Sequence, residues 1–120
     1  MLFRSPSVRD NCQLVVGYFD STLPKFRQEV LGNTPIALLH IDCDLYSSAK
    51  TVLNELKNNI VQNTIIIFDE YINYPGWELD EFRAWKEFRM ENQFSYEYVG
   101  YVSRHQKVAI RITNKSGRDW

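Results

Sequence analysis

Residues 36–42 read Ile-Ala-Leu-Leu-His-Ile-Asp, and residues 64–70 read Thr-Ile-Ile-Ile-Phe-Asp-Glu. Each stretch is a nearly continuous apolar run that ends in acid, which is typical of a strand covered on both faces in a parallel sheet. Between them, residues 46–60 carry apolar side chains at helical spacing. The sequence therefore predicts two neighbouring parallel strands, roughly 5 Å apart, joined by a crossover helix.

The other predicted elements continue this alternation on both sides. Residues 14–19 read as a short strand, followed by a helix over residues 25–31. Residues 77–90 read as a helix, and residues 94–102 and 107–112 as an antiparallel hairpin. The helical stripe expected in the core consists of Leu79, Phe82, Trp85 and Phe88. The sequence thus predicts an α/β fold, a parallel sheet with an antiparallel hairpin at one edge.

The composition limits the classes of protein that remain. The chain has 120 residues, 44% of them hydrophobic, and a net charge of -1, which suits one globular domain. We expect a loose arm at residues 1–13 and a polar tail at residues 113–120. Without a basic tract, a nucleic-acid or membrane-surface binder is not expected. Cys12 and Cys43 form no CxxC spacing, and no apolar run reaches the length of a signal peptide or membrane span, so we expect a cytoplasmic protein.

Asp42, Asp69 and Glu70 directly follow the two central strands. The carboxyl ends of parallel strands meet at one edge of a sheet, where α/β proteins bind ligands. Clustered carboxylates repel one another, and neither motif contains a Lys or Arg, so we expect a hard cation such as Mg²⁺. A single acid after a strand is more often a helix cap or turn former. We expect that role for Asp44, ahead of the helix that begins near Tyr46.

Two further features flank these acids. His40 should share a strand face with Asp42, and such a residue is more often packed in a core than used as a catalytic base. The loop at residues 71–77 is rich in aromatic residues, which either wall a substrate pocket or pack the loop onto the following helix. The aromatic residues that we expect to bind substrate are Tyr71, Tyr74 and Trp77.

Four motifs, taken in order, resemble the macrocin O-methyltransferase family, class I S-adenosylmethionine-dependent enzymes that act on sugar hydroxyls of natural products. The motifs are His40-Ile41-Asp42-Cys43-Asp44-Leu45-Tyr46-Ser47-Ser48, Ile66-Ile67-Phe68-Asp69-Glu70-Tyr71, Asn73-Tyr74-Pro75-Gly76-Trp77 and Glu81-Phe82-Arg83-Ala84-Trp85. The resemblance covers roughly residues 14–112. It implies a Rossmann-like sheet, Mg²⁺ held by Asp42, Asp69 and Glu70, and Asp42 as general base. The implied acceptor is a hydroxyl of a sugar or other small natural product.

The resemblance also bears on the methyl donor. Residues 16–24 resemble the family's segment before its fourth strand, and we expect Gly17, Tyr18 and Phe19 to contact S-adenosylmethionine. The family's Gly-rich cofactor turn and its first two strands have no counterpart in this chain. The resemblance therefore implies the C-terminal part of a methyltransferase. We expect this chain to bind S-adenosylmethionine weakly by itself, and to associate with a copy of itself or with the missing N-terminal half.

Two alternatives stay open at this point. Asp42-Cys43-Asp44 is an Asp-x-Asp motif, by which many glycosyltransferases hold a nucleotide-sugar diphosphate through a metal. That interpretation leaves Asp69, Glu70 and the aromatic loop without a role. The second alternative is a non-catalytic fragment, or a module that completes its sheet with a partner chain.

Overall fold

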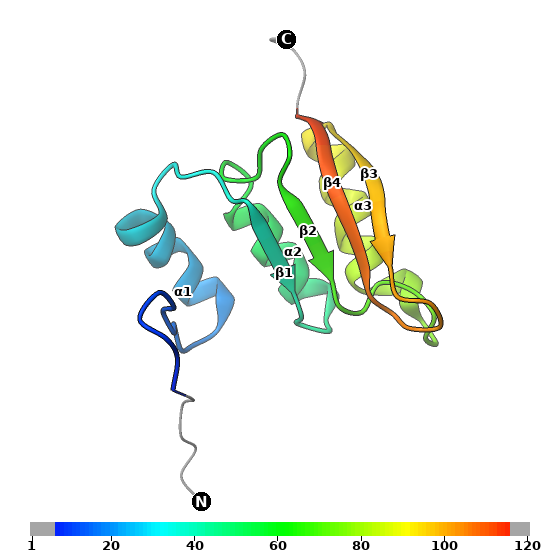
Figure 1. The fold of residues 1–120 in the computed structure, drawn as a ribbon, viewed down its shortest axis with the longest axis horizontal. Coiled ribbons are helices and arrows are strands. Elements are labelled where there is room, and N and C mark those ends of the chain that lie inside the picture. The colour runs from blue at the N-terminus through cyan, green and yellow to red at the C-terminus, as the bar shows by residue number, and fades with distance from the viewer. Residues whose placement is uncertain (1–6, 116–120) are drawn as a thin grey trace, which may run out of the picture.

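A four-stranded mixed sheet forms the centre of the molecule in the computed structural model, which describes residues 7–115 (Figure 1). The strands are β1 (Leu38–Ile41), β2 (Ile65–Phe68), β3 (Phe94–Tyr101) and β4 (Val108–Lys115). Their order across the sheet is β1-β2-β4-β3. β1 and β2 are parallel, and β4 runs antiparallel to both β2 and β3. The predicted α/β architecture with a terminal hairpin is therefore confirmed.

Helices precede and connect these strands. They are α1 (Phe19–Phe26), its π-helical continuation η1 (Arg27–Leu31), α2 (Tyr46–Glu55), the 3-10 turn η2 (Trp77–Leu79) and α3 (Glu81–Asn92). α2 and α3 pack side by side on one face of the sheet, while α1 lies beyond β1 and contacts α2 (Figure 1). No helix of residues 7–115 is both long and apolar enough to cross a membrane.

The core lies between the sheet and the helix pair α2–α3. Every second residue of a strand points to the same face, so Ile66 and Phe68 of β2 both turn toward the helices and are fully buried. From the helices, Leu53, Trp85 and Phe88 fill the space opposite them and are also fully buried. Burial of this apolar surface is the main force that holds the two layers together.

The opposite face of the sheet is open at β1. No helix of the described chain lies over that face of β1 and β2 (Figure 1), and Leu38 is 58% exposed. The prediction that the strand was covered on both faces is therefore wrong for this chain. Within residues 7–115 no second layer of helices covers the outer face of β1 (Figure 1).

The predicted strand at residues 14–19 is also wrong. Residues 14–18 form neither helix nor strand, and α1 begins at Phe19. A strand needs a hydrogen-bonded neighbour, and no strand of residues 7–115 pairs with this segment. Gly17 has a φ of 141°, which interrupts extension, and the Tyr18 carbonyl then accepts the N–H groups of Ser21 and Thr22. The helix expected at residues 25–31 thus begins six residues earlier.

Several element ends differ from expectation. The helix expected over residues 46–60 ends at Glu55, and turns follow it. The helix expected over residues 77–90 is broken at Asp80, whose backbone is not helical (φ -113°, ψ -119°). Because of this break Leu79 is 62% exposed and does not join the predicted core stripe.

The two ends of the chain follow the expected plan only in part. β4 continues to Lys115, so the start of the expected tail at residue 113 is paired with β3. Residues 7–13 of the expected arm contain no helix or strand. Residues 1–6 and 116–120 lie outside the described part of the chain.

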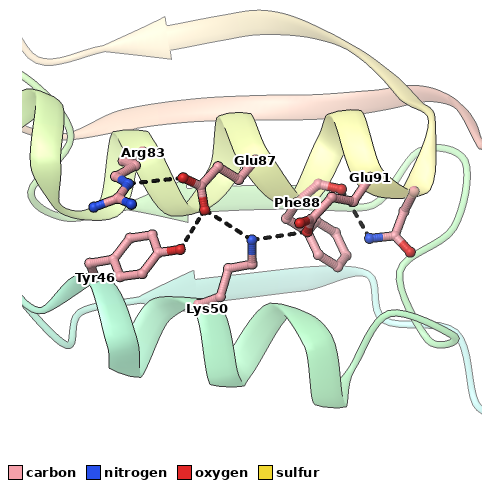
Figure 2. Close-up of polar contacts among 7 residues, drawn as sticks. Tyr46, Lys50, Arg83, Glu87, Phe88 and Glu91 are labelled. Carbon is pink, nitrogen blue, oxygen red and sulfur yellow. Dashed lines mark hydrogen bonds and ion pairs between the residues drawn. The ribbon is translucent and has the colours of Figure 1, made fainter.

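A polar network joins α2 to α3 on the side away from the sheet (Figure 2). Glu87 accepts hydrogen bonds from the Tyr46 hydroxyl, from Lys50 Nζ at 3.2 Å and from Arg83 Nε at 2.9 Å. Lys50 also bonds Glu91 at 2.9 Å. The Tyr46 hydrogen bond first, then those of Arg83 and Lys50, lower the pKa of Glu87 to about 2. The network fixes the first turn of α2, which directly follows the acidic residues after β1.

Candidate metal and cofactor site

Two acidic turns meet at the carboxyl ends of β1 and β2. The strands are in parallel register, and the backbone N–H of Asp69 donates to the Ile41 carbonyl at 3.0 Å, so the two turns begin side by side. Carboxylate oxygens of Asp42, Asp44 and Glu70 all lie within 4.8 Å of one another. The edge of the sheet expected to carry the site does gather three carboxylates.

Asp69 does not belong to this group of three. Its Oδ1 lies 3.2 Å from Lys107 Nζ and 3.3 Å from His40 Nε2. Burial opposes ionisation of Asp69, but the hydrogen bonds of Lys107 and His40 outweigh it and lower the pKa of the carboxyl. Asp69 and Glu70 lie in the bend that follows β2. Their side chains have different surroundings, because Asp69 meets Lys107 and His40 whereas Glu70 meets Asp42 and Asp44. His40 is half exposed and contacts Asp69.

Asp44 occupies the place in the group that the sequence assigned to Asp69. Its φ is 64°, in the left-handed region that Asp tolerates better than most residues. The N-cap of α2 is Leu45, with no side-chain cap hydrogen bond, so the expected capping role of Asp44 is wrong. The left-handed turn reverses the chain after β1 and brings the Asp44 side chain beside Asp42 and Glu70.

Glu81, the first residue of α3, lies beneath both acidic turns. It is fully buried. Its Oε1 accepts the backbone N–H of Glu70 at 3.0 Å, and its Oε2 accepts those of Asp44 at 3.3 Å and Cys43 at 3.4 Å. Sequence reasoning missed this residue, although it begins one of the recognised motifs. Its only sequence signal was an acid near the start of the helix predicted over residues 77–90, where an acid is ordinarily solvent-exposed.

Burial and neighbouring negative charges raise the pKa values of several groups in the site. A hydrogen bond with Asp44, then burial and the neighbouring negative charges, raise the pKa of Glu70 to about 7. Burial raises the pKa of Glu81, against the three N–H groups that it accepts. Burial, followed by the charge of Glu81, raises the pKa of the Cys43 thiol to about 12, which opposes formation of the thiolate.

The donor set fits a hard divalent cation. Three carboxylates supply the oxygen ligands that Mg²⁺ prefers, and a cation between them would relieve the repulsion that raises the pKa of Glu70. No Lys or Arg side chain makes an ion pair with Asp42, Asp44 or Glu70 within the described chain, so the negative charge is uncompensated there.

A cavity of about 610 Å³ opens beside this group. Its walls come from the segment that starts α1, from the turn after β1 and from one face of α2. The lining residues are Gly17, Tyr18, Phe19, Asp20, Ser21, Asp42, Cys43, Ser47, Ser48 and Thr51. The three residues expected to contact the cofactor therefore share one cavity with Asp42, although they are 23 residues or more apart from it in sequence.

The model of the macrocin-O-methyltransferase (TylF) family matches residues 5–99. The chain belongs to this family. Among solved structures it is similar to CalS11, a TDP-rhamnose 3′-O-methyltransferase of calicheamicin biosynthesis, in its apo form, with 26% identity and a TM-score of 0.63. It is equally similar to the O-methyltransferase NovP, with 26% identity and a TM-score of 0.63. A comparison with curated proteins gave no match.

These comparisons confirm the resemblance and the methyltransferase fold. The similarity covers 81% of this chain and 40% of CalS11, and 82% of this chain and 36% of NovP. This macrocin-O-methyltransferase family chain thus spans less than half the length of either structure. The relatives found are O-methyltransferases, and the glycosyltransferase alternative has no support among them.

The aromatic loop of this family member is well packed. Tyr71 is 1% exposed and its hydroxyl lies 3.0 Å from that of Tyr98. The Tyr74 hydroxyl donates to the Glu70 carbonyl at 3.3 Å, and the Trp77 ring meets that of Phe82 edge-on, with 4.8 Å between centroids. Tyr71 also lines a second, largely apolar cavity of about 460 Å³ beside β3. Trp77 thus packs onto the following helix α3, as one of the two interpretations of this loop expects. A substrate-binding role for Tyr71, Tyr74 and Trp77 stays a prediction.

Proposed function

We propose that this chain forms the metal- and acceptor-binding part of an S-adenosylmethionine-dependent, Mg²⁺-dependent O-methyltransferase that acts on a hydroxyl of a sugar or other natural product. The observation that carries the proposal is the convergence of Asp42, Asp44 and Glu70 within 4.8 Å in a chain of the macrocin-O-methyltransferase family. The TDP-rhamnose specificity of CalS11 supports a sugar hydroxyl as the acceptor.

In this proposal Asp42, Asp44 and Glu70 hold the cation, and Asp42 also accepts the acceptor's proton. Asp42 is exposed and lines the cavity that Gly17, Tyr18 and Phe19 share, so its carboxylate can reach a ligand there. Bound Mg²⁺ would lower the pKa of a nearby hydroxyl and so ease its loss of a proton. The chain's own contribution is to orient the acceptor and to hold the abstracted proton at the Asp42 carboxylate.

In this proposal, the chain forms only part of the binding site for S-adenosylmethionine. The proposed contacts at Gly17, Tyr18 and Phe19 form one wall of the cavity, and Tyr18 remains 85% exposed. Because the relatives are more than twice as long, we propose that a further segment or partner chain completes the cofactor pocket. Alone, the chain is then expected to bind the metal and to bind S-adenosylmethionine only weakly.

Calorimetric titration of the chain tests both halves of the proposal. We expect Mn²⁺, used as a probe for Mg²⁺, to bind the wild-type chain with a single-site isotherm, and Asp42→Asn to weaken it at least tenfold. Glu78→Gln, an exposed acid on η2, is the control for loss of one negative charge. Absence of saturable Mn²⁺ binding would refute the metal site. Micromolar binding of S-adenosylmethionine by the chain alone would refute the proposal that a further segment or partner chain completes the cofactor pocket.

A further inference from the structure

The hydrogen-bond partners of the Glu81 carboxylate all lie outside its own helix, α3. It is fully buried at the start of α3, yet within residues 7–115 no Lys, Arg or His makes an ion pair with it. Burying a carboxylate is costly unless other groups hold it. Here three backbone N–H groups do so, and all three come from the two acidic turns.

The two oxygens of Glu81 divide these turns between them. Oε1 accepts only the N–H of Glu70, from the turn after β2, at 3.0 Å. Oε2 accepts the N–H groups of Cys43 and Asp44, from the turn after β1, at 3.4 and 3.3 Å. Two of the three residues whose side chains converge, Asp44 and Glu70, are therefore held by their own backbone to one carboxylate.

This arrangement is not what stability alone would favour. Glu81 adds a fourth negative charge beside Asp42, Asp44 and Glu70, and that charge contributes to the raised pKa of Glu70. Two separate uncharged acceptors, one for each turn, could satisfy the same donors without this repulsion. A buried carboxylate is useful where both turns must be fixed and a cation is to be attracted, since groups behind a metal's ligands orient those ligands.

We propose that Glu81 is the positioning residue of the metal site, bridging the two turns so that Asp42, Asp44 and Glu70 face one point. This role rests on the proposed function and deepens it, because Glu81 would position the residues that bind the metal ion. Glu81 itself is directed at backbone amides and is not a metal ligand in this proposal.

Glu81→Gln is the sharpest test because it changes one oxygen into an NH₂ group of nearly equal size. The amide can accept from only one of the two turns, and the other turn is left facing a donor. We expect Mn²⁺ to bind about tenfold to a hundredfold more weakly, with the amide ¹H resonance of either Glu70 or Asp44 shifted upfield. Glu78→Gln, three residues earlier and exposed, removes the same charge and should leave Mn²⁺ affinity unchanged within twofold.

Glu81→Asp separates position from charge. The shorter side chain keeps the negative charge but cannot span both turns, so positioning predicts weakened Mn²⁺ binding, whereas a purely electrostatic role predicts none. A folded Glu81→Gln or Glu81→Asp protein with wild-type Mn²⁺ affinity would overturn the proposal.

A measurement on the unmodified chain covers the case in which neither variant folds. The backbone amides of Glu70 and Asp44 should exchange with solvent more slowly than those of exposed neighbours in the same turns, with downfield ¹H shifts typical of bonds to carboxylate. Rapid exchange at both amides would overturn the bridge. This readout needs no metal, so it stands even if the chain fails to bind Mn²⁺ and the proposed function falls.

Discussion

Asp69 Oδ1 and Lys107 Nζ lie 3.2 Å apart, an ion pair that ties the turn after β2 to the start of β4. The pair withdraws Asp69 from the acids with which the sequence groups it. A carboxylate that is paired with a cationic side chain binds a metal ion more weakly, because its negative charge is already compensated. The acids of the two turns are therefore unequal, which can be tested directly.

Asp44→Asn and Asp69→Asn form a matched pair of substitutions for that test. Each removes one carboxylate charge close to the same turns. We expect Asp44→Asn to weaken Mn²⁺ binding at least tenfold because it neutralises one of the three converging carboxylates, and Asp69→Asn to weaken it by about threefold or less. Calorimetric titration of both variants measures the difference. If Asp69→Asn weakened Mn²⁺ binding more than Asp44→Asn did, the metal ligands would instead be Asp42, Asp69 and Glu70.

Gly17→Ala should destabilise the segment that starts α1. At a φ of 141°, a Cβ on residue 17 would come within 2.6 Å of Thr22 Cγ2. Strain of this kind costs on the order of 1–3 kcal/mol, visible as a lower midpoint in urea unfolding. Gly100→Ala is the control, because its Cβ would meet nothing within 4 Å. Equal stability of the two variants would argue against the described turn at Gly17.

Acid should weaken the contact between α2 and α3 through Glu87. Its folded-state pKa of about 2 lies below the ordinary value of 4.5. A lowered carboxyl pKa stabilises the fold above pH 4.5, and this stability is lost as the pH falls from 4.5 toward 2. In that window Glu87→Gln should unfold with a shallower pH dependence than wild type, as followed by thermal melts.

Glu91→Gln serves as the comparison for the acid prediction. Glu91 is exposed and shares only the Lys50 contact of this network, so the wild-type pH dependence should persist in that variant. If Glu87→Gln and wild type lost stability in parallel between pH 4.5 and 2, the network would not hold the helices together.

Two leucines, Leu53 in α2 and Leu79 in η2, distinguish the observed core from the expected one. Leu53 is fully buried, and Leu79 is 62% exposed. Leu53→Ala should lower the free energy of unfolding by about 2–5 kcal/mol through lost contacts and a residual cavity, and Leu79→Ala by less than about 0.5 kcal/mol. Urea unfolding measures both, and a large loss for Leu79→Ala would restore the continuous helical stripe predicted over residues 77–90.

Local patterns predicted most of the elements. The apolar runs before Asp42 and Asp69, the helical spacing between them and the alternation after residue 94 correspond to β1, β2, α2 and the hairpin of β3 and β4. Each of these signals depends on burial of one face, which leaves a period in the sequence. The segment at residues 14–19 misled because its apolar residues signal a strand only where another strand can pair with it, and residues 7–115 provide none there.

The sequence by itself determined that acids would stand at the carboxyl ends of two adjacent parallel strands, because chain order and strand period set which residues end each strand. Only the tertiary structure decided which acids converge. Asp44 joins Asp42 and Glu70 through a left-handed backbone turn. Asp69 instead pairs with Lys107, which lies 38 residues later in the sequence. Glu81 reaches both turns from a third element. Such contacts depend on packing between distant segments, which leaves no local period in the sequence to reveal it.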